Sequence, residues 1–308
     1  MELLLLSWIL VLPMNFKYFL IVPTILFTII SCDMVVDVDL PDVPEKLVVN
    51  CLFATGEPLK VYVNHTVDIL YNSDSTSIVE NAVVRLYGDD TLLGTIPNQG
   101  QGVYMNETLI PLPGVRYRIV VSAPGYDDVW AEDTAPEPTA IDSIDFDILT
   151  YFDSEGIEYH RTGILFSDDP YSENHYEVIF QCFDTKYDYF FSYGPRNDND
   201  RVLTNEGDEL FYSKICVFSD ELINGQQYWL RIIDTRKIWE KKYKINLMTT
   251  SETMYKFRKS WIRHDYAKNP DILNPIEPVT LYSNINGGYG IFAGYSNSAY
   301  YINFYDEK

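Results

Sequence analysis

The sequence predicts a mainly β protein. We expect an N-terminal Ig-like or transthyretin-like β-sandwich, followed by a second β-rich domain with one C-terminal amphipathic helix. Tyrosine (25 residues) and phenylalanine (16 residues) are abundant, which favours strands over helices. From Leu47 to Glu132, short segments that alternate or carry β-branched residues are separated by turn residues, a spacing typical of a β-sandwich.

The chain begins with the pattern of a secretory leader, residues 1–31, for which Met14 is an alternative start. A charged beginning precedes an apolar run at 18–30, and Ser31 then stands directly before Cys32. This arrangement resembles a bacterial lipobox, in which the cysteine is acylated and becomes the new amino terminus. The alternative is a transmembrane helix, but the apolar run is shorter than the roughly 20 residues that a spanning helix needs. Cys32 is therefore the predicted lipid-attachment site.

Composition divides the remaining chain into three parts. Residues 32–45 are acidic and contain proline, so we expect a lipidated tether. The sandwich domain is predicted at 46–136, and the second β-rich domain at 140–308. The proline-containing stretch 134–139 marks the junction between them.

The strands of the first domain follow from alternation between turns. Tyr117, Ile119 and Val121 share one face of their strand and suit a core. The turn residues include Gly88-Asp89-Asp90 and Asn98-Gln99-Gly100. We expect strands at Leu47–Phe53, Leu59–Val67, Ala82–Tyr87, Thr91–Ile96, Gly102–Asn106, Tyr117–Val121 and Val129–Glu132.

Strands also dominate the second domain, at Ile144–Leu149, Gly163–Ser167, His175–Phe183, Ser213–Phe218, Tyr228–Ile233, Lys242–Met248, Gly290–Tyr295 and Tyr300–Phe304. A helix is predicted at about 250–266, with Thr249 as its cap and Glu252 completing a capping box. Its apolar face is formed by Met254, Phe257 and Trp261. The basic cluster lies on the opposite face and consists of Lys256, Lys259 and Arg263. This cluster is either a solvated face or a contact face, for an anionic partner or for the protein's own acidic body.

Residues 184–209 are polar, and we expect a long loop there. Its beginning is rich in aromatic side chains, which form either the end of a strand or an exposed patch that contacts a ligand. The aromatic residues concerned are Tyr187, Tyr189, Phe191 and Tyr193.

Charge restricts the partners of this chain. The formal net charge is −22, which repels nucleic acid, so we expect no DNA or RNA partner. Within 231–268, however, basic residues outnumber acidic ones and the local charge is positive. Cys182 and Cys216 are a plausible disulfide pair, although with Cys51 they are equally plausible as buried small apolar residues.

Sequence motifs give no catalytic or metal assignment. The four histidines are scattered, and no P-loop, dinucleotide fingerprint or G-x-S-x-G motif is present. Asp168, Asp169 and Glu173 offer oxygen ligands for Ca²⁺, although such a cluster is more often a solvated turn. We therefore expect a protein that is not an enzyme and has no cofactor.

Several separated stretches together resemble the domain-of-unknown-function family 4249. They are the lipobox with its acidic tether, Leu47-Val-Val-Asn50, Val84-Arg-Leu-Tyr87, Pro113-Gly-Val-Arg-Tyr117, Val121-Ser-Ala-Pro-Gly-Tyr126, Pro136-Glu-Pro with Ile141-Asp-Ser-Ile144, and Ser283-Asn-Ile-Asn-Gly-Gly-Tyr-Gly-Ile-Phe292. The resemblance implies an outer-membrane lipoprotein typical of Bacteroidota, often encoded beside a TonB-dependent receptor. The family has no assigned reaction, so only the role of Cys32 carries over.

The resulting expectation is a non-enzymatic exported lipoprotein, anchored in the outer membrane by its lipid. The resemblance implies a role as accessory to a TonB-dependent transport system. A glycan- or polymer-binding module is the alternative, and an unrecognised hydrolase is a third. Asp33, Asp37 and Asp39 follow the anchor closely, and acidic residues there resemble the surface-export signals of such lipoproteins. We therefore expect the cell surface rather than the periplasmic face.

Overall fold

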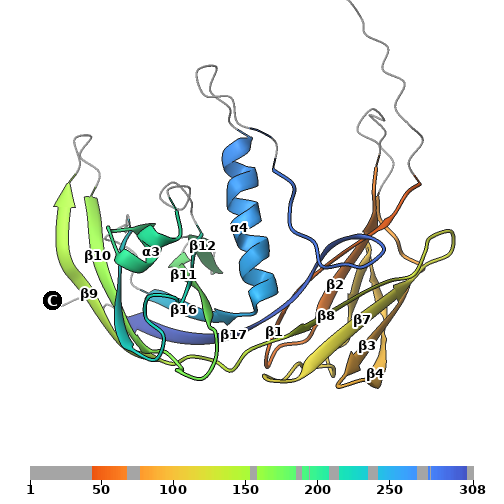
Figure 1. Cartoon of the computed structure of the whole chain (residues 1–308), viewed down its shortest axis with the longest axis horizontal. Coiled ribbons are helices and arrows are strands. Elements are labelled where there is room, and N and C mark those ends of the chain that lie inside the picture. Colours follow the sequence, from red (N-terminus) through yellow and green to blue (C-terminus); the bar gives the residue numbers. More distant parts are fainter. Residues whose placement is uncertain are drawn as a thin grey trace, which may run out of the picture. The chain divides into compact units, whose positions relative to one another are not determined.

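The computed structural model describes residues 44–67, 77–152, 158–184, 189–193, 195–207, 215–234, 242–268, 277 and 279–303 (Figure 1). The chain divides into two units, Met1–Pro44 and Glu45–Lys308, and the fold below is that of the second. The leader, Cys32 and nearly all of the tether lie outside the described residues.

The described residues form a mainly β fold, as the sequence predicts. The two helices are α3 (Arg201–Asn205) and α4 (Glu252–Ala267). The strands are β1 (Leu47–Ala54), β2 (Lys60–His65), β3 (Val83–Gly88), β4 (Thr91–Ile96), β5 (Asn98–Gly100), β6 (Val103–Met105), β7 (Arg116–Ser122), β8 (Val129–Thr134), β9 (Ile141–Phe152), β10 (Glu158–Ser167), β11 (His175–Asp184), β12 (Tyr189–Tyr193), β13 (Arg196–Asn197), β14 (Cys216–Ser219), β15 (Gln227–Asp234), β16 (Lys242–Thr250) and β17 (Tyr289–Asn303).

These strands form three sheets. The largest has the order β12-β11-β16-β17-β1-β2-β6-β5, and β14 pairs with β11 beside this path. The two smaller sheets have the orders β4-β3-β7-β8 and β13-β15-β10-β9. Each smaller sheet packs on the large one, so the large sheet contributes to two separate cores.

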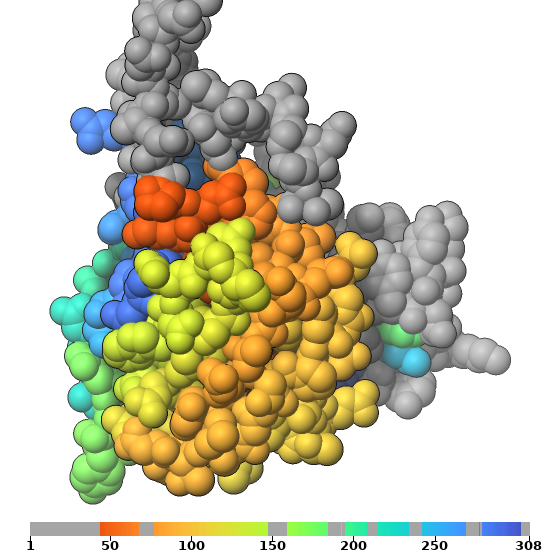
Figure 2. All heavy atoms as spheres, turned by 90° about the vertical axis from the view of Figure 1, so that its right-hand side faces the viewer, coloured from red at the N-terminus to blue at the C-terminus, as the bar shows by residue number. Residues whose placement is uncertain are grey.

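The first core is the predicted sandwich. Alternate residues of β1 point into it, beginning with Leu47 and Val49, and they face the inner side of β3 and β7. Tyr117, Ile119 and Val121 are buried there, so the prediction from their alternation is confirmed. Figure 2 shows this part from the side, as a continuous surface of orange to yellow-green residues.

The two predicted domains share one sheet. β1 pairs in parallel with β17, in a register that runs from Val48↔Tyr289 to Ala54↔Tyr295. Phe292 of β17 belongs to the sandwich core, together with Ile285. The expected boundary at 134–139 therefore separates most residues of the two cores, but β17, which lies beyond it, completes the first core. A parallel pair joins segments that are distant in the chain, and a pattern read along the sequence does not show it.

The second core lies between the other end of the large sheet and the sheet β13-β15-β10-β9. It buries Ile164 and Phe166 of β10 against Tyr176 and Val178 of β11. Helix α3 adds Val202 and Leu203 to this core. The sequence predicts a long loop over 184–209, and the structure places α3 within that range.

Polar residues at α3 satisfy one another. Asp200 caps the helix by accepting from the backbone N–H of Val202 at 2.9 Å. It also accepts from the Tyr228 hydroxyl and from the Arg231 backbone N–H, both at 2.9 Å. The Asp and Asn residues of this stretch predict a loop, because the same residue types are used in loops and as helix caps.

Helix α4 covers the opposite face of the large sheet (Figure 1). Successive residues of a strand alternate between faces, so Leu247 lies in the second core while Met248 packs under α4. The sequence predicts the helix at about 250–266, and it is found at Glu252–Ala267. Its cap is Ser251, whose Oγ accepts from the Met254 backbone N–H at 3.1 Å.

Thr249, the predicted cap, has a different role. It is buried at the end of β16, and its Oγ1 accepts from the Thr139 backbone N–H at 2.9 Å. The strand extends through Thr250, so the first residue available to cap the helix is Ser251. Glu252 is then the first residue of the helix, and the predicted capping box with Thr249 does not form.

The cysteines do not form the disulfide considered above. Cys216 pairs across the sheet with Val178, and Cys182 lies four residues further along β11. Four residues of strand span about 13 Å, well beyond the roughly 7 Å between Cα atoms that a disulfide tolerates. Both residues are buried, as is Cys51. Burial raises the pKa of the Cys51 and Cys216 thiols, so neither is a reactive thiolate.

Candidate functional site

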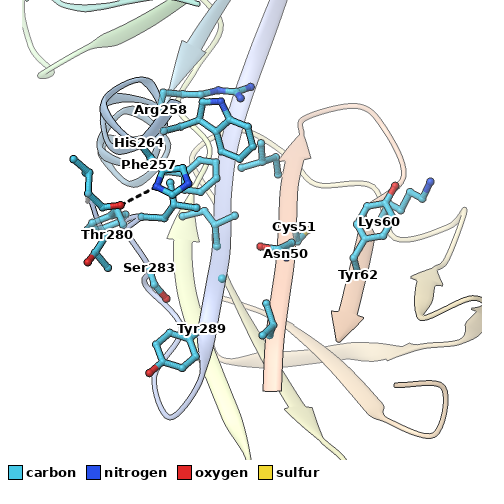
Figure 3. Close-up of a pocket in the computed structure, with 18 residues that line it drawn as sticks. Asn50, Cys51, Lys60, Tyr62, Phe257, Arg258, His264, Thr280, Ser283 and Tyr289 are labelled. Carbon is cyan, nitrogen blue, oxygen red and sulfur yellow. Dashed lines mark hydrogen bonds between the residues drawn. The ribbon is translucent and has the colours of Figure 1, made fainter. Parts of the chain in front are cut away.

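A pocket of about 880 Å³ lies between α4, the segment 279–283 and the large sheet (Figure 3). This volume is within the range of small-molecule binding sites, roughly 300–1,000 Å³. The pocket opens on the face of the sheet opposite both cores. We take it as the candidate functional site, because it combines a large volume with exposed aromatic rings and few polar groups.

The floor of the pocket comes from β17, β1 and β2. In β1 every second residue enters the sandwich core, so Val48, Asn50 and Leu52 face the pocket instead. Cross-strand pairing places Asn50 between Ile291 of β17 and Tyr62 of β2. A polar amide therefore occupies the middle of a floor that is otherwise aliphatic and aromatic.

One wall of the pocket is α4, which presents Phe257, Trp261 and His264. Their spacing of four and three residues places them on one side of the helix. The other wall is the segment 279–283, which is tied to α4 at two points. The His264 Nδ1–H donates to the Val279 carbonyl at 2.8 Å, and the Tyr282 backbone N–H donates to the Ser260 Oγ at 2.9 Å.

Three aromatic rings at the pocket remain largely accessible. The exposed fractions are 43% for Tyr62, 39% for Trp261 and 51% for Tyr289. Figure 3 shows Tyr62 and Tyr289 on different sides of Asn50. The Lys60 ammonium lies 5.0 Å from the centre of the Tyr62 ring, a cation–π distance. Exposed rings with a polar handle are suited to ligands that have both an apolar face and hydrogen-bonding groups.

The electrostatics of the pocket differ from those of the chain. None of its 18 lining residues is acidic, although the whole chain has a net charge of −22. Arg258 is used in the structure, because its Nε donates to the buried Glu177 carboxylate at 2.8 Å. Lys60 forms no ion pair with any residue that the structure describes. Asn50 likewise makes no side-chain hydrogen bond within the described ranges.

The lining of the pocket is mainly apolar and aromatic, with a few polar groups. It contains no carboxylate, and the Nδ1–H of His264 is held by a backbone carbonyl. Among its residues with a thiol or a hydroxyl, Cys51 has a pKa raised by burial, and the Ser283 Oγ accepts from the Ile285 backbone N–H at 3.4 Å. In the described parts of the chain, no group of His, Cys, Asp and Glu has the arrangement of a metal site.

The residues considered as calcium ligands have different environments, because Asp168 is buried whereas Asp169 and Glu173 are exposed in the turn. Asp168 is buried and accepts from the Tyr176 hydroxyl at 2.5 Å and from the Gly225 backbone N–H at 2.8 Å. Asp169 accepts from the Ser172 hydroxyl at 2.7 Å. These hydrogen bonds occupy carboxylate oxygens that would otherwise be available to a cation. Asn174 also donates to Asp168 and to the Asp169 carbonyl, so the cluster stabilises this turn.

The predicted basic cluster on α4 has three different environments. Lys256 is exposed and pairs with Glu252 at 2.7 Å, and Arg263 is also exposed. Lys259 is mostly buried, and its ammonium lies 2.9 Å from the Glu206 carboxylate at the end of α3. Lys256 and Arg263 are thus on an exposed face, whereas Lys259 contacts the acidic body of the protein itself, because the helix packs over the sheet at this point.

The predicted aromatic patch is only partly within the structure. Tyr187 lies outside the described residues, and so does the lipid-attachment residue Cys32. The backbone of Tyr189, Phe191 and Tyr193 belongs to β12, which pairs with β11. Their side chains lie outside what the structure describes, so their proposed contacts with a ligand stay a prediction.

Sequence reasoning missed the pocket itself. The helical spacing predicts Phe257 and Trp261 in the apolar face of the helix together with Met254. Met254 is fully buried, whereas Trp261 is 39% exposed at the mouth of the pocket. The available signal was Asn50, a polar residue between the apolar Val48 and Leu52 on the strand face that alternates with the core positions. Only the pairing of β1 with β17 shows what this residue faces.

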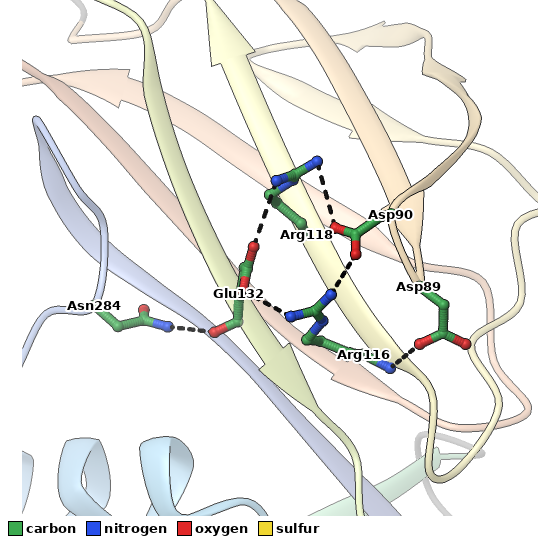
Figure 4. A network of polar contacts seen from close by, with 6 residues as sticks. All are labelled: Asp89, Asp90, Arg116, Arg118, Glu132 and Asn284. Atoms are coloured by element: carbon green, nitrogen blue, oxygen red, sulfur yellow. Dashed lines mark hydrogen bonds and ion pairs between the residues drawn. The ribbon is translucent and has the colours of Figure 1, made fainter.

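Polar residues also meet on the outer face of the sheet β4-β3-β7-β8 (Figure 4). Arg116 lies 2.5 Å from Asp90 and 3.9 Å from Glu132. Arg118 lies 3.6 Å from Glu132 and 3.8 Å from Asp90. The two arginines and two carboxylates balance in charge, and such partly exposed pairs contribute at most about 1 kcal/mol each. This cluster therefore stabilises the turn after β3 and gives no net charge for a partner.

The two lysines of α4 give the first testable prediction. Replacing Lys259 with methionine should lower the free energy of unfolding by about 2 kcal/mol, because a buried carboxylate loses a charged donor. Burial raises the pKa of Glu206, but hydrogen bonds from Tyr255, Lys259 and Ser219 outweigh it, so the pKa lies below its usual value.

The matched control is Lys256→Met, which removes an exposed pair and should change stability by less than about 1 kcal/mol. Urea denaturation of both variants at neutral pH measures the difference. Equal small losses for the two lysines would contradict the burial of the Lys259–Glu206 pair.

Comparison with known proteins gives one family match. The profile described as "Domain of unknown function (DUF4249)" matches residues 34–300, and no curated protein matches the chain. Solved structures that are similar include a beta-glycosidase from Bacteroides vulgatus, with 12% identity and a TM-score of 0.21. That match covers 68% of this chain but only 24% of the glycosidase. Domains 3–5 of Drosophila OTK match with 9% identity and a TM-score of 0.16, over 68% of this chain and 95% of that one.

At these TM-scores the two solved structures are distant neighbours. No helix in the described ranges has the length and apolar character that a membrane span needs. The family profile, in contrast, covers most of the sequence and includes β1, the pocket and α4. The chain belongs to the DUF4249 family.

Proposed function

We propose that this chain is a non-enzymatic exported lipoprotein that binds a ligand in the pocket beside α4. The observation that carries the proposal is the pocket itself, with three accessible aromatic rings and no carboxylate among its lining residues. Binding sites have this character when a few placed polar groups orient a ligand on apolar walls.

The location and the partner are part of the same proposal. Cys32, preceded by a short apolar run, supports a lipid anchor in the outer membrane, and the acidic tether supports exposure at the cell surface. The family resemblance supports a TonB-dependent receptor as partner. In this role the lipoprotein would hold a ligand close to the receptor that imports it.

The test uses the full chain in its native membranes. The wild type should incorporate radiolabelled palmitate and should co-purify with a large β-barrel receptor. Cys32→Ser lacks the thiol that is acylated, so both the label and the membrane association should be lost. Equal labelling of the two proteins would overturn the anchor, and purification of the labelled wild type without a β-barrel partner would overturn the transport role.

A further inference from the structure

The polar atoms of the pocket restrict its ligand. Asn50 carries two amide N–H donors and a carbonyl acceptor, and none of them has a partner among the described residues. Its neighbours on the pocket floor are Val48, Leu52, Ile291 and Tyr62. A polar group that a ligand covers without a hydrogen bond costs binding free energy. The ligand must therefore offer hydrogen-bonding groups at the centre of the floor.

The aromatic rings give the second restriction. Tyr62, Trp261 and Tyr289 present accessible ring surface around that amide. Such rings stack on flat apolar faces. The ligand must therefore carry both hydrogen-bonding groups and flat apolar faces in the part that enters the pocket.

We infer that the pocket binds a neutral oligosaccharide. A pyranose ring has two C–H faces that stack on aromatic rings, and its hydroxyls lie around its edge, where Asn50 and Lys60 can bond to them. Ser283 and Thr280 add hydroxyls at the wall. This inference rests on the proposed function and names the ligand class of the same site.

Other ligand classes fit the pocket less well. An acyl chain would cover Asn50 without a hydrogen bond. An extended peptide usually adds to a free strand edge, but β17, β1 and β2 each have a paired strand on both sides. An anionic ligand would approach a chain of net charge −22, and among the described residues Lys60 is the lining cation without a carboxylate partner.

The experiment titrates the full chain with neutral oligosaccharides by calorimetry. The probes are oligomers of glucose, xylose, mannose, galactose and N-acetylglucosamine, from disaccharide to hexasaccharide. The lipoprotein is kept in a detergent without a sugar head group, such as lauryldimethylamine oxide, because maltoside detergents would compete. We expect binding to at least one series. No binding in any series would overturn the inference, whereas the transport role would still be judged from co-purification.

Three variants locate the binding in the pocket. Asn50→Leu keeps the size of the side chain and matches the apolar character of Val48 and Leu52, so the thermal midpoint should stay close to that of the wild type. Saccharide affinity should fall by about tenfold or more, the effect of a lost buried hydrogen bond. Binding of a neutral apolar probe, N-phenyl-1-naphthylamine, should be unchanged or tighter. Undiminished saccharide binding by Asn50→Leu would overturn the assignment of the site.

Trp261→Ala is the second variant, and it should also lower saccharide affinity by about tenfold, because a stacking surface is lost. Its matched control is Trp229→Ala, since Trp229 is 41% exposed and lies outside the pocket. The third variant, Tyr289→Ala, should likewise lower saccharide affinity, and its matched control is Tyr301→Ala, because Tyr301 is 62% exposed on the same strand. If the controls lose as much affinity as the pocket variants, the saccharide binds elsewhere and the inference is wrong.

Discussion

Replacing Gly290 with alanine should destabilise the protein by about 3–5 kcal/mol, a large share of the roughly 5–15 kcal/mol by which folded proteins are stable. Gly290 lies in β17 with a φ of +111°, which side chains other than glycine rarely adopt. A Cβ at this position would overlap the backbone carbonyl of Val49 in the neighbouring strand. The backbone strain and the displacement of the neighbouring strand each cost about 1–3 kcal/mol, and these two costs add.

The control for Gly290→Ala is Gly125→Ala. Gly125 has a φ of +89°, but no neighbouring atom lies within 4 Å of the position that an alanine Cβ would take, so its substitution costs only the conformational strain. Urea denaturation of the two variants separates the clash from the strain. If both lose the same stability, β17 can move away from β1 at no cost, and their close parallel pairing does not stabilise the fold.

Replacing Arg258 with methionine should cost about 3–5 kcal/mol at about pH 8, since it leaves a buried carboxylate without its charge partner. Glu177 is nearly inaccessible, and the Arg258 Nε donates to it at 2.8 Å. Glu206 loses less in Lys259→Met, because Tyr255 and Ser219 still donate to it. No second donor to Glu177 is present in the described residues.

The loss in Arg258→Met should depend on pH. Burial raises the pKa of Glu177, and the Arg258 guanidinium opposes that shift. Without Arg258 the pKa rises further, so the folded protein binds a proton more tightly than the unfolded chain does. The unfolded chains of the two proteins titrate alike, so the stability of the variant relative to the wild type should decline as pH rises from the folded pKa of Glu177 in the wild type through its higher folded pKa in the variant.

Unfolding midpoints at about pH 5 and about pH 8 measure this difference. Glu177→Gln combined with Arg258→Met removes both charges and should recover most of the loss, since a pair replaced together is close to neutral. A deficit that is independent of pH, or a double variant as unstable as Arg258→Met, would show that lost packing of the arginine causes the effect.

These residues also show what could be read from the sequence. Alternation in Tyr117–Val121 predicts that Tyr117, Ile119 and Val121 enter the sandwich core, and this is confirmed. The helix near 250–266 follows from its apolar spacing, and it is found within two residues of the expected limits. Such features depend on neighbours in the chain, so a local pattern carries them.

The sequence by itself therefore determined the family, the mainly β class, the first core and the principal helix. The tertiary structure decided the rest, because each remaining feature joins segments that lie far apart in the chain. Pairing of β1 with β17 unites the two expected domains and turns Asn50 toward the pocket. Packing of α4 over the sheet buries Lys259 against Glu206, although its spacing from Lys256 and Arg263 predicts a solvated position. Burial of a side chain depends on what covers it, and a periodic sequence does not specify the covering segment.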